Sequence, residues 1–510
     1  MNDADYIIVG GGAAGCVLAD RLTADGGRSV LLVEAGRPDP ETYPEVQIPV
    51  LFHRMFGSEL DWNFETVPQE RLDGRRIPIP RGKALGGSSV IHAQLWTRGH
   101  RADFDGWAAD GYHGWAHEDL LRYFERAEDR IRLGGLRYPT PSTADFLNAC
   151  ARLGYRPATE QQEGYVLAKA AHHDGLRWTS ADGYLQHARD RDNLRILTGA
   201  QAQRVLFEGT RAVGVEVATP DGVRQLTSTQ EVVLAAGSVG TPQLLMLSGV
   251  GPAEDLAALG IPVVVDAPHV GRNLVDHLVV PLAFEGLGFE SPGADAGPEE
   301  MEQYLKDRTG PLDSVVSEAV LFLRTNERLA APDVEVVHLV IPFGENPTQV
   351  RHGFALGVIQ LKPHSRGTIR LRSADPAHAP LIDPGYLSDV DAVDLATVVA
   401  GVRRAQEILR EPDVARWRGA PLTEGALADD DEAIAGYVRR TGMSIHHLVS
   451  SCRMHPRRDA GALDTSFRVH GATGLRVVDA SAMPGTVRAH TYAAVTMLAE
   501  KASDLITAAD

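Results

Sequence analysis

The chain opens with short apolar runs separated by a glycine-rich turn and a stretch of mixed polarity. Residues 6–9 are apolar, glycines follow at once, and residues 16–24 combine apolar and polar positions in the manner of an amphipathic helix. A second apolar run covers residues 30–33. Short runs of this kind are typical of buried parallel strands. The pattern predicts a strand, turn, helix and strand unit.

Further elements are predicted by the same criteria. Residues 232–236 form another apolar run that ends at a glycine, and residues 475–478 are expected to form a strand that ends at an acid. Residues 334–340 and 367–371 show the alternation of strands with two unlike faces. No internal repeat or heptad pattern interrupts this mixture of helices and strands.

Length and composition narrow the class of protein. A chain of 510 residues exceeds what one core usually organises, so we expect two domains, either of which can be discontinuous in sequence. The net charge of -18 and the lack of basic clusters argue against nucleic acid as a partner. The histidines and acids lack metal-ligand spacing, so no metal site is expected.

We also expect no targeting signal in this chain. The first residues are acidic rather than basic, and no run approaches the roughly 20 apolar residues that span a bilayer. The three cysteines lack paired spacing. We therefore expect a soluble cytoplasmic protein with no signal peptide and no membrane span.

The glycine turn has the spacing of a dinucleotide cradle. Gly10 would permit the tight turn, Gly12 the approach of a pyrophosphate, and Gly15 the packing of helix on strand. Glu34 ends the second strand, where a carboxylate accepts hydrogen bonds from ribose hydroxyls. A glycine turn can also simply close a strand-helix unit, but helix, strand and acid together favour an adenosine diphosphate. The pattern does not separate FAD from NAD.

Longer motifs resemble one family. Residues 81–99 closely resemble the first signature of the glucose-methanol-choline (GMC) oxidoreductases, and residues 237–251 resemble the second. The likeness extends to residues 271–277 and to residues 474–506. Within the family, the chain resembles the choline dehydrogenases and aryl-alcohol oxidases. This resemblance favours FAD over NAD.

The resemblance also implies an architecture of mixed α/β class. It consists of a Rossmann-like FAD-binding domain with a parallel sheet and a substrate domain with an antiparallel sheet flanked by helices. We assign residues 1–137, 193–276 and 441–510 to the FAD-binding domain. Residues 138–192 and 277–440 form the substrate-binding domain in this interpretation.

A pair of histidines is expected to carry the chemistry. Residues 446–454 resemble the family's active-site motif, and counting back from Cys452 selects His447. The second member follows from residues 483–491, where this chain has His490. By this resemblance His447 would accept the hydroxyl proton of an alcohol while His490 bonds its oxygen. Asp276 and His277 are expected to be structural and receive no chemical role.

Cofactor binding is expected to be noncovalent. Some relatives attach FAD through a histidine four residues after the paired glycines, and this chain has Ile91 there. The neighbouring His92 is expected to contact the flavin. The full set of predicted cofactor residues is Gly10, Gly12, Ala13, Ala14, Gly15, Glu34, Ala35, Trp62, Arg81, Leu85, Gly86, Gly87, Ser88, His92, Ala93, Gln94, Leu95, Ala202, Ala236, Gly237, Asp479, Ala480, His490 and Thr491.

The predicted activity is FAD-dependent oxidation of a small-molecule alcohol to a carbonyl by hydride transfer to the flavin. His92 favours a primary aromatic or allylic alcohol, and the electrons would leave to oxygen or another acceptor. The alternatives are a hydroxynitrile lyase with a redox-idle FAD and a flavin-binding protein without catalysis. The glycine- and proline-rich residues 286–300 would either gate the site or simply connect two elements.

Overall fold

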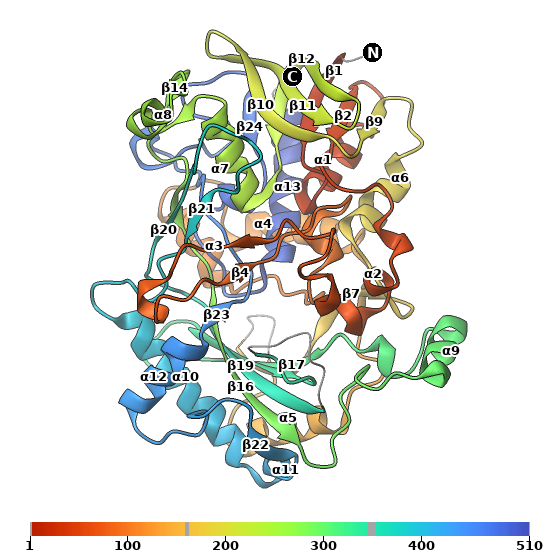
Figure 1. Cartoon of the computed structure of the whole chain (residues 1–510), viewed down its shortest axis with the longest axis vertical. Helices are drawn as coiled ribbons and strands as arrows, with labels where there is room; N and C mark the ends of the chain where they lie inside the picture. Colours follow the sequence, from red (N-terminus) through yellow and green to blue (C-terminus); the bar gives the residue numbers. More distant parts are fainter. Residues whose placement is uncertain (1–2, 159–162, 345–351, 509–510) are drawn as a thin grey trace.

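The chain forms two layered halves that face each other (Figure 1). This computed structural model describes residues 3–158, 163–344 and 352–508. One half is built on a sheet of parallel and antiparallel strands, the other on an antiparallel sheet. Both chain ends lie at the same end of the molecule, beyond the first sheet. These features confirm the predicted mixed α/β fold class.

The first sheet has a parallel centre. Its strands lie in the order β10-β11-β12-β1-β2-β9, and β24 pairs with the end of β12. β1 runs parallel to both β2 and β12, while β10 and β11 are antiparallel. The bounds are β1 Asp3–Val9, β2 Val30–Val33, β9 Leu194–Leu197, β10 Gln201–Glu208, β11 Arg211–Thr219, β12 Gly222–Leu234 and β24 Leu475–Val477.

The helix after the first strand differs from its expected form. It is α1, Ala13–Leu22, and eight of its ten residues are buried, whereas an amphipathic helix would expose one face. The cause is α13, Thr491–Thr507, which packs along α1 and covers the side away from the sheet. The helix is therefore sandwiched between the sheet and the last helix of the chain.

The second sheet is antiparallel. Its order is β22-β16-β19-β18-β17-β6, and β23 pairs with β16. Helix α10, Val393–Arg410, packs on one face together with α12, and the first half of the molecule covers the other. The bounds are β6 Gly164–Leu167, β16 Leu278–Gly286, β17 Ser317–Leu323, β18 Val334–Leu339, β19 Gly353–Gln360, β22 Arg418–Pro421 and β23 Met443–Ser444.

Burial on both faces of this sheet differs from the predicted alternation. Every residue of β18 is buried, because Val334 and Val336 pack against α10 while Val337 and Leu339 face the first half. The other predicted strand, β20, joins a separate small sheet with β15 and β21. The two faces of β18 therefore pack against two different partners, and neither of them is a solvent face.

The remaining strands and α-helices lie outside the two large sheets. The strands are β3 Phe64–Glu65, β4 Pro78–Ile79, β5 Leu133–Gly135, β7 Lys169–His173, β8 Leu176–Arg177, β13 Val250–Gly251, β14 Val265–Asp266, β15 Arg272–Leu274, β20 Gly367–Arg370 and β21 Leu381–Asp383. The helices are α2 Pro44–Gln47, α3 Arg101–Ala109, α4 His117–Glu128, α5 Pro141–Arg152, α6 Gln186–Ala188, α7 Gly237–Leu247, α8 Ala253–Ala258, α9 Pro298–Asp307, α11 Pro412–Ala415 and α12 Asp431–Thr441.

The two sheets draw on different parts of the sequence. The first takes its strands from residues 3–9, 30–33, 194–234 and 475–477. The second takes nearly all of its strands from residues 164–167 and 278–421, with β23 added from the C-terminal part. This distribution supports the proposed domain division, in which β23 crosses to the neighbouring sheet.

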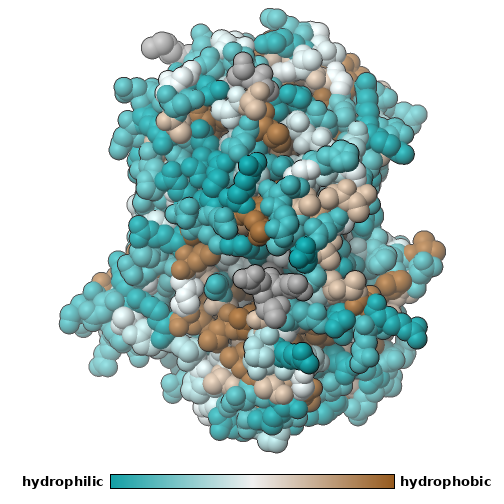
Figure 2. All heavy atoms as spheres, turned by 180° about the vertical axis from the view of Figure 1, so that it is seen from behind, coloured by the Kyte–Doolittle hydropathy of each residue, from teal (hydrophilic) through white to brown (hydrophobic). Residues whose placement is uncertain are grey.

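The face of the molecule seen from behind is mostly hydrophilic (Figure 2). Seen from behind, apolar residues gather in small groups among polar ones (Figure 2). Such scattered apolar exposure is ordinary for a globular protein. In the part of the chain that the structure describes, no helix is both long and apolar enough to cross a bilayer.

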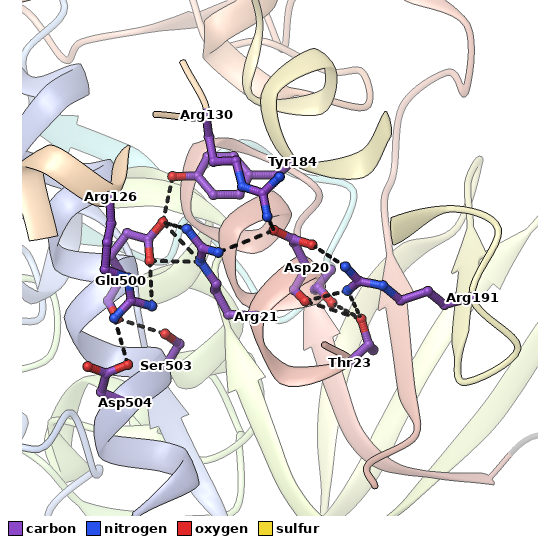
Figure 3. Close-up of polar contacts among 11 residues, drawn as sticks. Asp20, Arg21, Thr23, Arg126, Arg130, Tyr184, Arg191, Glu500, Ser503 and Asp504 are labelled. Atoms are coloured by element: carbon purple, nitrogen blue, oxygen red, sulfur yellow. Dashed lines mark hydrogen bonds and ion pairs between the residues drawn. The ribbon is translucent and has the colours of Figure 1, made fainter. Parts of the chain in front are cut away.

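A buried ionic cluster ties α1 to α13 (Figure 3). The carboxylate of Glu500 on α13 is fully buried and accepts hydrogen bonds from Arg21 of α1 at 2.7–3.1 Å and from the Tyr184 hydroxyl at 2.8 Å. Arg126 of α4 approaches the same carboxylate at 2.8 Å. On the neighbouring turn Asp20 pairs with Arg191 at 2.8 Å. The cluster fixes the last helix against the helix that follows the glycine turn.

Replacing Glu500 with glutamine should destabilise the protein. The change leaves the two arginines without their buried anion, and we expect a loss of about 2–3 kcal/mol in the free energy of unfolding, because both arginines are partly exposed. Urea unfolding followed by tryptophan fluorescence measures it. Asp504→Asn, which removes a half-exposed partner of Arg126, is the matched control and should cost under about 1 kcal/mol. Equal losses would contradict this role for Glu500.

Candidate active site

A cavity of about 580 Å³ lies between the two sheets. Its first wall is formed at the carboxyl ends of β1 and β2, where Gly10 and Glu34 line it. Its opposite wall is formed by the second sheet, through Val337, Leu339 and Ile359. Ligands of open α/β sheets bind at the carboxyl ends of the strands. The cavity therefore lies where the sequence predicts a nucleotide.

The glycine turn is shaped as the spacing predicts. Gly10 has a φ of 107°, and a Cβ there would lie 2.4 Å from the carbonyl oxygen of Ala235. At Gly15 a Cβ would lie 1.9 Å from the Gly10 carbonyl oxygen, so only glycine lets the helix pack this closely. At Gly12 the nearest atom to a Cβ would be 3.7 Å away, and the residue lines the cavity. The space beside Gly12 fits a pyrophosphate at the N-terminus of α1.

Glu34 is held by backbone amides at the end of β2. One carboxylate oxygen accepts from Gly11 N–H and the other from Gly36 N–H, each at 2.7 Å. Burial raises the pKa of Glu34 to about 7 despite these two donors. A ribose hydroxyl that donated to this carboxylate would favour its charged form.

The other end of the cavity contains polar side-chain atoms without a partner among the described residues. Nδ1 of His92 accepts from Gln94 N–H at 3.0 Å and lies 3.2 Å from Arg177. Burial and the nearby Arg177 lower the pKa of His92 to about 3, so its proton sits on Nε2, one of these unpartnered atoms. The Gln94 amide, two guanidinium nitrogens of Arg81 and Nδ1 of His446 are the others that face this end. A large ligand with ring nitrogens and carbonyls, such as a flavin, fits this donor set.

Most of the predicted cofactor residues line this cavity. They are Gly10, Gly12, Ala13, Ala14, Glu34, Ala35, Trp62, Arg81, Gly87, Ser88, His92, Ala93, Gln94, Leu95, Ala202, Ala236, Gly237, Asp479, Ala480, His490 and Thr491.

The exceptions are Gly15, Leu85 and Gly86, which lie behind the lining. Gly15 packs α1 on its own turn, and Gly86 N–H donates to the Gly11 carbonyl at 2.7 Å. The Leu85 side chain packs beside Gly11. These three residues shape the turn from behind rather than face its ligand.

The two predicted histidines meet inside the cavity. His447 lies in the loop after β23, and His490 is the residue before α13. Their ring centroids are 4.8 Å apart with the planes at 88°, and both line the cavity. Ser450, in the turn after His447, has a φ of 68°, a conformation that favours glycine.

Residues from the second half hold both imidazoles. Nδ1 of His447 lies 2.9 Å from Nδ1 of His277, and Asp276 accepts from the His447 backbone N–H at 2.8 Å. Nε2 of His490 lies 3.0 Å from the buried carboxylate of Glu335 on β18. Burial, with the nearby His490 and His277, holds the pKa of His447 well below its usual range. His447 is therefore uncharged at neutral pH and able to accept a proton.

Three of these neighbours have no chemical role in the sequence motifs. Asp276 and His277 are predicted to be purely structural, and the structure places both in contact with His447. Glu335 belongs to none of the motifs, although it is the one acid within the apolar residues 334–340. An acid inside a strand of this kind is the signal that identifies it.

Residues 286–300 pack on the protein rather than on the cavity. Phe289 and Ser291 are buried, and Ser291 exchanges hydrogen bonds with Gly353. None of the residues in this segment, all of which the structure describes, lines the cavity.

The chain belongs to the GMC oxidoreductase family. Its N-terminal family model matches residues 4–279 and its C-terminal model residues 363–499. The chain is similar to an uncharacterised GMC-type oxidoreductase of Mycobacterium tuberculosis, with 40% identity over 99% of both chains. It is also similar to an alcohol dehydrogenase (acceptor) of Pseudomonas putida, with 36% identity over 98% of this chain and 95% of the relative. Mitochondrial choline dehydrogenase of Homo sapiens is 35% identical over 99% and 90%.

The fold is shared with solved structures of FAD proteins. A formate oxidase of Aspergillus oryzae RIB40, in a mutant studied for its effect on FAD modification, superimposes with a TM-score of 0.92. The two sequences are 26% identical, and the match covers 100% of this chain and 98% of that one. This chain is accordingly an FAD-dependent oxidoreductase that acts on alcohols, and its residues fit the cofactor that the family uses.

FAD affinity should fall as the pH falls through 7. Because the pKa of Glu34 without cofactor is about 7, the carboxyl is protonated below that pH and must lose its proton to accept from the ribose. We expect the dissociation constant of FAD from the apoprotein to rise by about tenfold between pH 8 and pH 6. Fluorescence titration of apoprotein measures it. With Glu34→Gln the affinity should be weaker and this step should vanish, and an unchanged pH profile would contradict the assignment.

Proposed function

We propose that this protein oxidises a primary alcohol to a carbonyl with His447 as the base and His490 as its partner. The observation that carries the proposal is the pair of imidazoles in the cavity, 4.8 Å apart, beside the residues predicted to contact the flavin. FAD, when bound, accepts the hydride from the alcohol carbon. The chain's own residues bind the alcohol and accept its hydroxyl proton.

The two histidines differ in what surrounds them. Nε2 of His490 lies 3.0 Å from the buried carboxylate of Glu335, which orients its ring. His490 hydrogen-bonds the alcohol oxygen as negative charge develops on it. The ring of His447 contacts another imidazole instead of a carboxylate and has a lowered pKa. It is therefore uncharged at neutral pH, and we assign the acceptance of the proton to it.

The walls around the substrate end favour an uncharged, apolar alcohol. Val316, Val337, Leu339 and Phe343 line it from the second half, and Phe52 with Phe56 approach from the first. Among the described lining residues the only acids are Glu34 and Asp479, which both hold backbone amides of the cofactor half. A quaternary ammonium group therefore has no carboxylate of this lining to pair with. A benzylic or allylic alcohol matches these walls.

We further propose that FAD is held without a covalent bond. Ile91 stands where some relatives have the linking histidine, and it is buried against the cavity. Oxygen or another acceptor then removes the electrons.

Replacing His447 with alanine should nearly abolish flavin reduction. Without a base the hydroxyl proton has no acceptor, and we expect the rate constant of anaerobic flavin reduction to fall by about 10²–10⁴-fold. Stopped-flow absorbance measures it, and FAD content should remain that of the parent protein. Acid precipitation should release yellow flavin from both proteins, in keeping with noncovalent binding. Reduction at the parent rate would remove His447 from this role.

Anaerobic bleaching of the flavin should rank alcohols by their polarity. Benzylic, furanic and allylic primary alcohols should reduce the flavin, while choline and sugars should react at least about 10²-fold more slowly, because desolvating their polar groups is not compensated by this lining. Mixing the reduced protein with air or a quinone then identifies the acceptor. Faster reduction by choline would contradict the proposed substrate class. A flavin that no alcohol bleaches would contradict oxidation itself and favour lyase chemistry.

A further inference from the structure

We propose that His277 is a positioning residue that sets the tautomer of His447, so that Nε2 of His447 carries the free lone pair. The inference rests on the proposed role of His447 as the base. It is carried by the contacts of a fully buried imidazole outside the predicted catalytic pair.

Both ring nitrogens of His277 have partners. Nε2 lies 3.0 Å from the backbone carbonyl oxygen of Leu361 and 2.8 Å from Oγ1 of Thr486. Nδ1 lies 2.9 Å from Nδ1 of His447. The two rings meet at 82°, with one edge turned toward the other.

The carbonyl decides where the proton of His277 sits. A carbonyl oxygen accepts and never donates, so the contact with Leu361 requires a hydrogen on Nε2. Burial, with His490 and Lys362 nearby, lowers the pKa of His277 to about 3, so the ring carries one proton at neutral pH. That proton is on Nε2, and Nδ1 is therefore an acceptor.

The tautomer of His447 follows from this. An acceptor at 2.9 Å from its Nδ1 requires a hydrogen there, because two facing lone pairs would repel. The ring is neutral, so Nε2 has none. The hydrogen bond from the His447 backbone N–H to Asp276 fixes the residue along the chain as well. The base thus reaches its proton-accepting form without a titration step.

The groups that surround His277 and His447 favour the uncharged form of both rings. Arg81, His446 and His490 surround His447, and each disfavours a proton on it. Lys362 lies near His277, paired with Asp103 at 3.1 Å. The oxygens of Asp276 accept from the His447 amide, Ser444 and Tyr386, so this carboxylate is engaged away from either ring.

The experiment compares His277→Leu with His277→Asn, which have nearly the same size. The asparagine oxygen can accept from Nδ1 of His447, and leucine cannot. In a serine protease triad, a histidine left in the wrong tautomer lowers kcat by about 10⁴-fold. We expect His277→Leu to lower the rate constant of anaerobic flavin reduction by about 10²–10⁴-fold, with the substrate dissociation constant within about threefold of the parent. His277→Asn should recover at least about tenfold of the loss.

A matched control separates this effect from packing. His338 is another buried histidine with a pKa of about 3, and it packs between Phe146 and Phe354 on the opposite face of the second sheet. His338→Leu removes an imidazole of the same size and should leave flavin reduction within about threefold of the parent. A loss equal to that of His277→Leu would assign both effects to packing and overturn the proposal.

Nitrogen-15 spectra of histidine-labelled protein test the tautomer without turnover. Bare and protonated imidazole nitrogens differ strongly in chemical shift, and His447→Gln assigns the signal. The parent protein should show a bare Nε2 and a protonated Nδ1 on His447, and His277→Leu should reverse them. A protonated Nε2 in the parent would overturn the proposal even if both leucine variants failed to fold. Loss of activity in His447→Ala with full activity in His277→Leu would overturn this inference alone.

Discussion

Hydrogen bonds between side chains join the halves of the molecule at the reaction centre. His447 and His490 belong to the C-terminal segment that packs on the first sheet, while their partners His277 and Glu335 belong to the second. Neither histidine is oriented by its own half alone. The site therefore exists only when the two sheets are packed together, and the cavity between them is a product of the same contact.

The reaction centre is lined by hydrogen-bonding side chains rather than by acids, although the whole chain is acidic. The net charge is -18, yet the flavin end of the cavity is lined by Arg81 and by His92, His446, His447 and His490. The negative charge that develops on an alcohol oxygen as it loses its proton is stabilised by donors of this kind. The buried carboxylates of Asp276 and Glu335 lie behind the histidines and hold them, rather than facing the substrate.

The nucleotide end of the site is more predictable from the sequence than the reaction centre. Gly10, Gly12 and Glu34 act through the local geometry of one strand-turn-helix unit, and spacing along the chain is sufficient to identify it. The histidine pair is found only through the family motifs. The contacts of His447 with His277 and of His490 with Glu335 join positions 170 and 155 residues apart, and no spacing rule relates them. Burial is likewise predicted incompletely, because the polar positions of α1 suggest a solvent face but meet Glu500 and its neighbours instead.

The ionic cluster between the first and last helices forms late during synthesis, because its partners lie at opposite ends of the chain. Arg21 and Glu500 are 479 positions apart, so α1 leaves the ribosome long before its partner is made. At about 5–20 residues per second this interval is on the order of a minute. During that time the nascent chain exposes Arg21 and the outer side of an apolar helix without their cover. A chain that lacks α13 would therefore leave Arg21 and the outer side of α1 uncovered.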